Sequence, residues 1–147
     1  MPQLIPPIPV DSIEPYSEQQ VIAELMAQLP KDCKLYHNFE FVKSSSASSK
    51  SSGRQLQEGE VDAVILWPEK GLLVLEIKGG QIEYCVNSDS WTASNRQGRF
   101  SIKNPMKQAR GNMHALITAI ERELEEELKG AFTYGYAVVF PLSLIHI

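Results

Sequence analysis

The sequence predicts a mixed α/β domain in which a central sheet is flanked by helices. Apolar residues recur at helical spacing in two segments, residues 17–29 and 105–128. Between and after these segments lie shorter runs with the two-residue period of strands. The chain has 147 residues, 43% of them hydrophobic, which is enough for one core but not for two domains. The expected order is helix, three or four strands, long helix and a last strand.

The first helix follows a proline-rich start. Prolines punctuate residues 1–16, which predicts an extended arm. Ser17 is expected to cap the helix, with Gln20 completing a capping box, and Pro30 is expected to end it.

A strand and a polar segment come next. Residues 34–42 alternate in strand fashion, and the face expected to share one side is Leu35, His37, Phe39 and Phe41. Residues 43–56 are rich in serine and predict a flexible loop. Lys50 and Arg54 in this loop are candidate contacts to a phosphate backbone, and a solvated tether is the alternative.

The second half of the chain predicts a small hairpin, a long helix and a closing strand. Residues 81–86 and 91–94 suit antiparallel strands, and residues 95–99 suit a loop. Asn104 before Pro105 is a strong helix start, because the asparagine side chain can cap and the proline fits the first helical position. The remaining expectations are a helix end at Gly130 and a strand over residues 135–141.

Charge, cysteines and hydropathy exclude several classes of protein. The net charge of −4 argues against binding nucleic acid through the overall field, although local charge could still do so. No run of 18 apolar residues and no signal-peptide pattern occur, which predicts a cytoplasmic protein without a membrane partner. Cys33 and Cys85 belong to no zinc or disulfide pattern, so both are expected to be inert thiols.

Charged residues inside a predicted hairpin point to a site. Residues 59–66 and 72–78 read as two buried strands, yet they carry Asp62, Glu76 and Lys78. Charged groups are rarely buried unless they are paired or bind a metal. If the turn pairs position 66 with position 72, an even register brings Asp62 opposite Glu76, with Lys78 one step along the same face. A salt bridge at a strand end is the alternative.

Two adjacent carboxylates would repel each other and therefore favour a cation between them. Mg²⁺ suits such a pair, because it binds one or two carboxylates together with backbone oxygen and water. The backbone carbonyl of Ile77 lies between the two charged positions of the second strand and is a candidate ligand. Lys78 could orient a water molecule or stabilise charge on a phosphate.

The start of the long helix is a second candidate site. Lys103, Lys107 and Arg110 lie near its positive end, which is unfavourable unless an anion is bound there. Gln108 projects away from the apolar stripe of this helix. An ordinary exposed residue is the alternative for Gln108.

The ordered motifs of the chain resemble the NERD (nuclease-related) domain of the PD-(D/E)xK nuclease superfamily. The motifs are residues 59–66 (GEVDAVIL), residues 74–80 (VLEIKGG), Trp91, residues 104–109 (NPMKQA) and residues 136–141 (YAVVFP). The proline that precedes the aspartate in the formal superfamily motif is replaced here by Val61. The resemblance covers residues 17–141 and implies a restriction-endonuclease-like core.

The resemblance also implies roles for individual residues. Asp62 and Glu76 would hold Mg²⁺ or Mn²⁺, and Lys78 would be the catalytic lysine. Glu18 would help to hold the metal or a water, and Gln108 would lie near the site. For Glu18 the alternatives are a role at the helix dipole and replacement by Glu24 of the same helix.

The implied activity is metal-dependent hydrolysis of DNA in DNA processing, repair or defence. The DNA contacts would be Lys103, Lys107 and Arg110 of the long helix, with Lys50 and Arg54 of the serine-rich loop. The alternatives are a catalytically silent DNA-binding module and a purely structural domain. A homodimer is an expectation if both DNA strands are cut.

Three further residues are expected to be structural. His37 and His114 have no ligand partner at metal spacing, and Trp91 is expected in the core or a turn rather than as a platform for bases.

The last six residues, 142–147 (LSLIHI), follow no turn or capping pattern, and their codons can spell a transposon-end sequencing adapter. We therefore expect a truncated chain whose missing part includes a helicase-like or kinase-like domain, as in other proteins with NERD domains.

Overall fold

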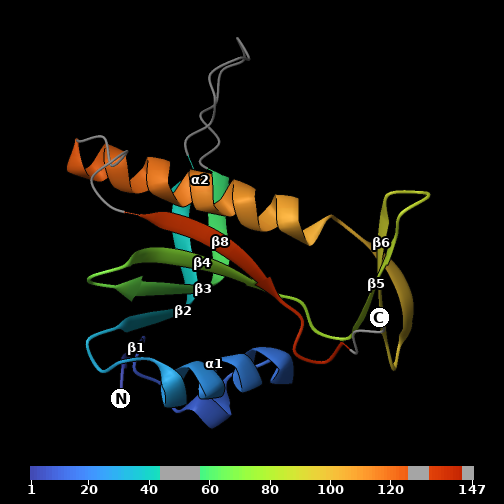
Figure 1. Cartoon of the computed structure of the whole chain (residues 1–147), viewed down its shortest axis with the longest axis horizontal. Coiled ribbons are helices and arrows are strands. Elements are labelled where there is room, and N and C mark those ends of the chain that lie inside the picture. Colours follow the sequence, from blue (N-terminus) through green and yellow to red (C-terminus); the bar gives the residue numbers. More distant parts are fainter. Residues whose placement is uncertain (44–56, 126–132, 144–147) are drawn as a thin grey trace.

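A five-stranded mixed sheet forms the centre of the molecule (Figure 1). The computed structural model describes residues 1–43, 57–125 and 133–143. The strand order in the sheet is β1-β2-β3-β4-β8, with β2, β3 and β4 antiparallel and both edge strands parallel to their neighbours. The strands are β1 (Gln3–Ile5), β2 (Lys34–Lys43), β3 (Gln57–Trp67), β4 (Gly71–Ile77) and β8 (Tyr134–Val139).

Two helices cover the two faces of this sheet (Figure 1). Helix α1 (Tyr16–Gln28) contributes Val21 and Ile22 to one apolar cluster, together with Ala63 and Ile65 of the sheet. Helix α2 (Pro105–Leu124) contributes residues such as Leu116 to a second cluster on the opposite face. This helix, sheet, helix layering confirms the predicted fold class and is consistent with a restriction-endonuclease-like core.

A second, three-stranded antiparallel sheet lies at one end of the molecule. It consists of β5 (Gln81–Cys85), β6 (Ser90–Asn95) and β7 (Gly98–Ile102), and it connects β4 to α2 (Figure 1). The prediction of a loop over residues 95–99 is wrong, because Asn95 ends β6 and Gly98 begins β7. Gly98 has a φ of 137°, a conformation that favours glycine and permits the tight turn.

The amino-terminal segment is more structured than an arm. Gln3–Ile5 adds a parallel edge strand to β2, and Val10–Ser12 forms a short 3-10 helix, η1. Helix α1 then begins at Tyr16 with Pro15 in the capping position, and no side chain caps it. The predicted capping role of Ser17 is therefore wrong. Ser17 is buried within the first turn, and Gln20 bonds to the Tyr16 hydroxyl instead.

The predicted start of α2 is confirmed. Oδ1 of Asn104 accepts hydrogen bonds from the backbone N–H groups of Met106 and Lys107, at 3.0 and 3.3 Å. Pro105 occupies the first helical turn. The helix ends at Leu124, and the expected cap at Gly130 lies outside the described residues.

Strand β2 changes the face that its side chains occupy. Asn38 has a φ of 53°, in the left-handed region, and the regular pairing with β3 skips this residue. His37 keeps the α1 side with Leu35, whereas Phe39, after Asn38, packs into the cluster under α2. The predicted shared face of Leu35, His37, Phe39 and Phe41 is therefore wrong, because alternation holds only while the backbone stays extended.

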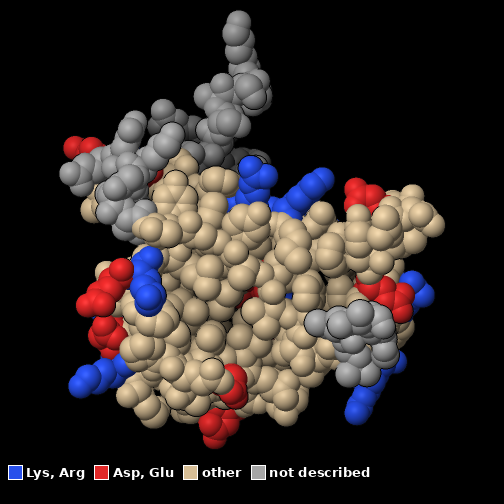
Figure 2. Space-filling view, in the orientation of Figure 1, with Lys and Arg blue, Asp and Glu red and all other residues tan. Residues whose placement is uncertain are grey.

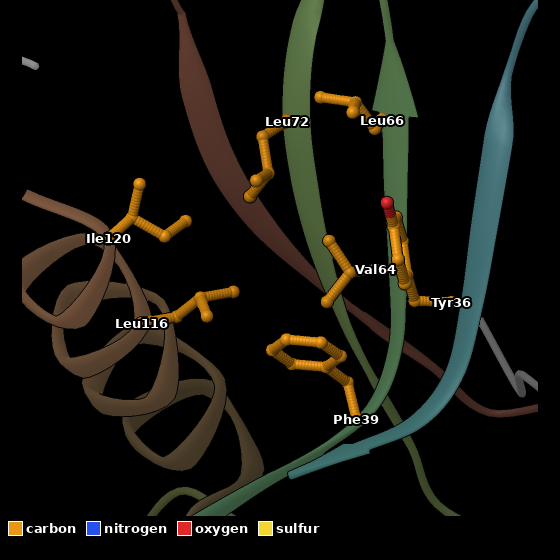
Figure 3. Close-up of a pocket in the computed structure, with 7 residues that line it drawn as sticks. All are labelled: Tyr36, Phe39, Val64, Leu66, Leu72, Leu116 and Ile120. Atoms are coloured by element: carbon orange, nitrogen blue, oxygen red, sulfur yellow. The ribbon is translucent and has the colours of Figure 1, made fainter. Parts of the chain in front are cut away.

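An apolar cavity of about 340 Å³ lies between α2 and the sheet (Figure 3). Its seven lining side chains, none of them charged, are Tyr36, Phe39, Val64, Leu66, Leu72, Leu116 and Ile120. Among these lining side chains only Tyr36 carries a polar group, its hydroxyl, so the cavity lacks the several convergent polar groups of a typical ligand site. In the part of the chain that the structure describes, no helix is long and apolar enough to cross a membrane.

Candidate active site

The β3–β4 pairing ends where the charged residues begin. The predicted register is confirmed, since Leu66 pairs with Leu72, but the regular ladder stops at Ala63 and Leu75. Beyond that pair, the Ile77 N–H donates to Oδ2 of Asp62 at 2.7 Å. A carboxylate thus takes a hydrogen bond that a continuous ladder would give to a backbone carbonyl.

Strand β3 is distorted at Asp62. Val61 and Val64, three positions apart, both pack in the cluster under α2, which a regular two-residue period forbids. The distortion lies opposite Asn38 of β2, at the position that the pairing skips. Regular alternation predicted that Asp62 shares a face with Val64, and the distortion removes that relation. The orientation of the Asp62 side chain therefore depends on the distortion of β3.

Glu76 and Lys78 form an ion pair at the end of β4. Lys78 Nζ lies 2.9 Å from Glu76 Oε1, and their side chains are 25% and 6% exposed, respectively. The Lys78 N–H donates to the Val139 carbonyl, which extends the pairing of β4 with β8. The ion pair holds a nearly buried carboxylate beside a lysine that reaches solvent.

Helix α1 brings Glu18 to the same region. The first turns of α1 and α2 and the end of β4 lie toward one side of the molecule (Figure 1). A Cβ atom at Gly79 would lie only 2.7 Å from Ser17 Oγ, so glycine permits the close approach of α1 to the segment after Lys78. Glu24, the alternative on this helix, instead bonds to Gln28 and is exposed.

His37 is a partner of Glu18 that sequence reasoning missed. Its Nε2 lies 3.1 Å from Glu18 Oε2, and the imidazole is only 8% exposed. The sequence predicts a structural His37 because no ligand partner lies at metal spacing, and the contact forms only because α1 packs on the face that His37 shares with Leu35. His114, by contrast, is exposed on α2, as a structural role allows.

The three carboxyls share one electrostatic environment. Burial raises the pKa of Glu18, Asp62 and Glu76 above ordinary values, and it is the largest cause in each. The charge of Asp62 raises the pKa of Glu18 and of Glu76 further. Hydrogen bonds from His37, Ile77 and Lys78 oppose these increases without cancelling them. The cluster therefore lacks enough positive charge to balance its carboxylates.

The donor set fits a hard divalent cation held by few protein ligands. Within the described residues, no group of three or more His, Cys, Asp or Glu side chains has the arrangement of a metal cage. Mg²⁺ is usually bound by one or two carboxylates and several waters, which the pair Asp62 and Glu76 can supply. The repulsion between these carboxylates is the observation that favours such an ion.

The start of α2 forms a separate hollow of about 450 Å³. It is lined by Lys103, Asn104, Lys107, Gln108, Gly111 and Asn112. In the described structure, Gln108 hydrogen-bonds to none of the three carboxylates through its side chain. Figure 2 shows Lys and Arg side chains above the part of the surface formed by α2. The other predicted basic contacts, Lys50 and Arg54, lie outside the described residues.

The two cysteines differ in environment. Both are free thiols. Cys33 is buried, and burial raises its pKa, which fits the expected inert thiol. Cys85 is exposed, and a hydrogen bond from Ser88 lowers its pKa, so the thiolate is more accessible there than the sequence predicted.

The comparisons with known proteins agree with the motif analysis. The family model described as "Nuclease-related domain" (NERD) matches residues 15–141, which is most of the 147-residue chain. A comparison with curated proteins and another with solved structures gave no match. The chain belongs to the NERD, or nuclease-related domain, family.

Proposed function

We propose that this chain is a divalent-metal-dependent DNA nuclease that hydrolyses phosphodiester bonds. The observation that carries the proposal is the gathering of three carboxyls with raised pKa beside a lysine, in a domain of the nuclease-related family. A balanced structural ion-pair network would leave these carboxyls with ordinary or lowered pKa values. Charge that lacks compensation instead favours binding of a cation and, through it, of a phosphate.

Asp62 and Glu76 would hold Mg²⁺ or Mn²⁺, with the Ile77 carbonyl as a further oxygen ligand. When bound, such an ion supplies a polarised phosphate and a water of lowered pKa. The Ile77 N–H donates to Oδ2 of Asp62 at 2.7 Å and so fixes this carboxylate, which leaves Oδ1 to bind the metal ion. Val139 similarly anchors the backbone at Lys78.

Lys78 would act on the substrate. Its ammonium pairs with Glu76 in this structure and is partly exposed, so it can donate to a phosphate oxygen or orient the attacking water. Glu18, held by His37, would bind a water at the same site. Gln108 would act from the α2 side, in the hollow that it lines together with Lys103 and Lys107.

DNA would approach along the start of α2. Lys103, Lys107 and Arg110 would bind backbone phosphates, and the positive end of the helix dipole adds to their attraction. Lys50 and Arg54 would extend this contact. We also propose that the chain forms a homodimer to cut both strands and associates with a helicase-like partner.

The decisive experiment is a cleavage assay with matched lysine variants. Purified protein should cut plasmid and labelled oligonucleotide DNA with Mg²⁺ or Mn²⁺ but not with EDTA. Lys78→Ala should abolish cutting while keeping the circular dichroism spectrum. Lys70→Ala, at the opposite end of the same hairpin, should cut at the wild-type rate, because the Lys70 ammonium lies over the ring of Trp67, far from Lys78 along the β3–β4 pairing. Loss of activity in both variants, or in neither, would contradict the role of Lys78.

A silent DNA-binding module is the second candidate. The Glu76–Lys78 ion pair favours it, because a carboxylate already neutralised by lysine binds a cation less strongly. If wild type and Asp62→Asn bind DNA with equal affinity and neither cuts it with any divalent metal, the chain is a catalytically silent DNA-binding module.

A further inference from the structure

The three-stranded sheet has one face made of apolar and aromatic side chains. Cross-strand partners in this sheet share a face. One row pairs Tyr84 with Trp91 and Trp91 with Ile102, and the next pairs Ile82 with Ala93 and Ala93 with Phe100. The opposite face is polar and carries the exposed Glu83–Arg99 ion pair. Phe140 covers part of the apolar face by stacking on Trp91, whereas Tyr84 and Phe100 at its edges remain exposed.

Two aromatic rings on this face are open to solvent. Tyr84 and Phe100 are each 46% exposed, although aromatic side chains usually gain stability by burial. The Tyr84 ring is held in place, because its hydroxyl donates to Asp89 at 2.8 Å and its ring lies 4.7 Å from that of Trp91. A ring that is both rigid and exposed is suited to stacking with a ligand.

This face is connected directly to the candidate active site. Trp91 stacks on Phe140, with centroids 6.3 Å apart and planes at 15°. Phe140 follows Val139, whose carbonyl accepts the Lys78 N–H. Phe140, Trp91 and Tyr84 therefore form a row of three rings. Phe140 is adjacent to Val139, which accepts the hydrogen bond of the Lys78 backbone, and Tyr84 is the exposed end of the row.

The charge of the surrounding segment favours a polyanion. Residues 90–120 contain five Lys and Arg residues and no Asp or Glu. The rest of the chain carries all 18 acidic residues but only nine of the 14 basic ones. This basic segment includes β6, β7 and most of α2, so it borders the aromatic face at the turn that contains Arg96 and again at Lys103.

We propose that unpaired nucleotides of the DNA substrate stack on Tyr84 and Phe100 while the adjoining phosphates meet Arg96 and Lys103. This proposal rests on the proposed nuclease function and specifies its substrate as DNA with a single-stranded segment. Bases in a duplex already stack on each other, whereas unpaired bases present their faces to aromatic side chains. Phe100 and Trp91 lie within the segment that has Lys and Arg but no Asp or Glu, which suits this ligand better than an apolar protein surface.

The test is a binding measurement that needs no cleavage. The wild-type protein in EDTA is titrated against a fluorescein-labelled 20-nucleotide single strand and against the duplex of the same sequence, at one fixed salt concentration. We expect tighter binding of the single strand. Phe100→Ala and Tyr84→Ala should each weaken single-strand binding by about 5-fold to 150-fold, as the loss of one stacked base predicts, and should leave duplex binding nearly unchanged.

Matched variants separate stacking from folding. Phe100→Leu keeps apolar bulk without a ring and should behave like Phe100→Ala, whereas Phe100→Tyr should restore single-strand binding. Tyr136→Ala removes another exposed ring, from β8, and should bind as wild type. Circular dichroism verifies that each variant is folded.

The outcomes distinguish this inference from the proposed function. Equal binding of single strand and duplex, or full affinity in both Ala variants, would overturn the inference even if the protein cuts DNA. Binding that follows the predicted pattern without cleavage would support the inference while the nuclease proposal fails. A Phe100→Ala variant that changes the oligomeric state in light scattering, with unaltered DNA binding, would identify the face as a contact between copies and would also overturn it.

Discussion

At the scale of single residues, the main feature of the described chain is a group of three buried or partly buried carboxyls, one of which is paired to a lysine. Glu76 is 4% exposed, and its nearest counter-charge, Lys78, lies partly in solvent. The ordinary cost of burying an ionised carboxyl is several kcal/mol unless charges and hydrogen bonds compensate. Since burial remains the largest influence on the pKa of Glu76, the compensation is incomplete, and the free energy of unfolding should depend on its protonation.

Replacing Glu76 by glutamine should change the pH dependence of stability. A carboxyl whose pKa is raised on folding binds protons more strongly in the folded state, so the free energy of unfolding falls as pH rises through the interval between its ordinary and raised pKa. In metal-free buffer, wild type should therefore lose stability relative to Glu76→Gln as pH rises from about 4.5, the ordinary glutamate value, and the difference should level off above the raised pKa. Urea unfolding at a series of pH values measures this. A difference that is independent of pH would contradict it.

His37 should matter through Glu18. The imidazole lies 3.1 Å from the Glu18 carboxylate, whose pKa the charge of Asp62 also raises. Removing a residue that orients a ligand commonly costs about 10–100-fold in metal affinity or activity. His37→Ala should therefore raise the Mn²⁺ concentration needed for half-maximal cleavage by roughly that factor.

The control for this variant is His114→Ala on the exposed surface of α2, which should need the wild-type Mn²⁺ concentration. His37→Gln keeps an N–H donor and should recover part of the loss. Equal Mn²⁺ requirements in wild type and His37→Ala, with a lower melting temperature alone, would mean that His37 is only structural.

At the scale of elements, the start of α2 is fixed by one side chain. Asn104 caps two backbone N–H groups, and the same residue lines the hollow with Lys107 and Gln108. Asn104→Ala should lower the free energy of unfolding by about 0.5–2 kcal/mol, whereas Asn104→Ser should cost much less because serine also caps. Chemical denaturation of the two variants checks this. Equal losses would mean that the cap bonds do not stabilise the helix.

The elements that sequence predicted correctly are those with local signals. The Asn104 and Pro105 pair predicts α2 because both effects operate within one turn. The change of face in β2 was not predicted, because it depends on the left-handed φ of Asn38, which lies opposite Asp62 in the β2–β3 pairing. Strand β7 was missed because Gly98 was interpreted as a loop residue, although it also permits a tight hairpin turn.

The candidate site was predictable in composition but not in geometry. Apolar periodicity predicted the pairing of Leu66 with Leu72, and this pairing brings Asp62 and Glu76 to the same end of the hairpin. The contribution of His37 depends on helix α1 packing across the sheet, which brings Glu18 within 3.1 Å of a strand 19 residues later. Contacts of this kind follow from tertiary packing, which no local pattern encodes.

At the scale of the whole molecule, charge is segregated. A chain of net charge −4 carries its uncompensated carboxyls at one site and a segment without any acidic residue beside it. DNA phosphates would be attracted by residues 90–120 and repelled by Glu18, Asp62 and Glu76. A divalent cation removes that repulsion, so metal binding should precede productive DNA binding.

Divalent metal should therefore stabilise the folded protein before any DNA is present. A ligand that binds only the folded state at 100 times its Kd adds about 2.7 kcal/mol, which corresponds to roughly 5–10 °C in Tm for a chain of this size. Differential scanning fluorimetry with Mn²⁺ or Mg²⁺, against NaCl of equal ionic strength, measures the shift in Tm.

Asp62→Asn should lose this shift because a ligand charge is removed, whereas Glu83→Gln on the exposed β5 should keep it. The shift should also weaken as pH falls toward the raised carboxyl pKa values, since protons then compete with the ion. An equal shift in Asp62→Asn would place the metal elsewhere and leave the carboxyl cluster without a cation.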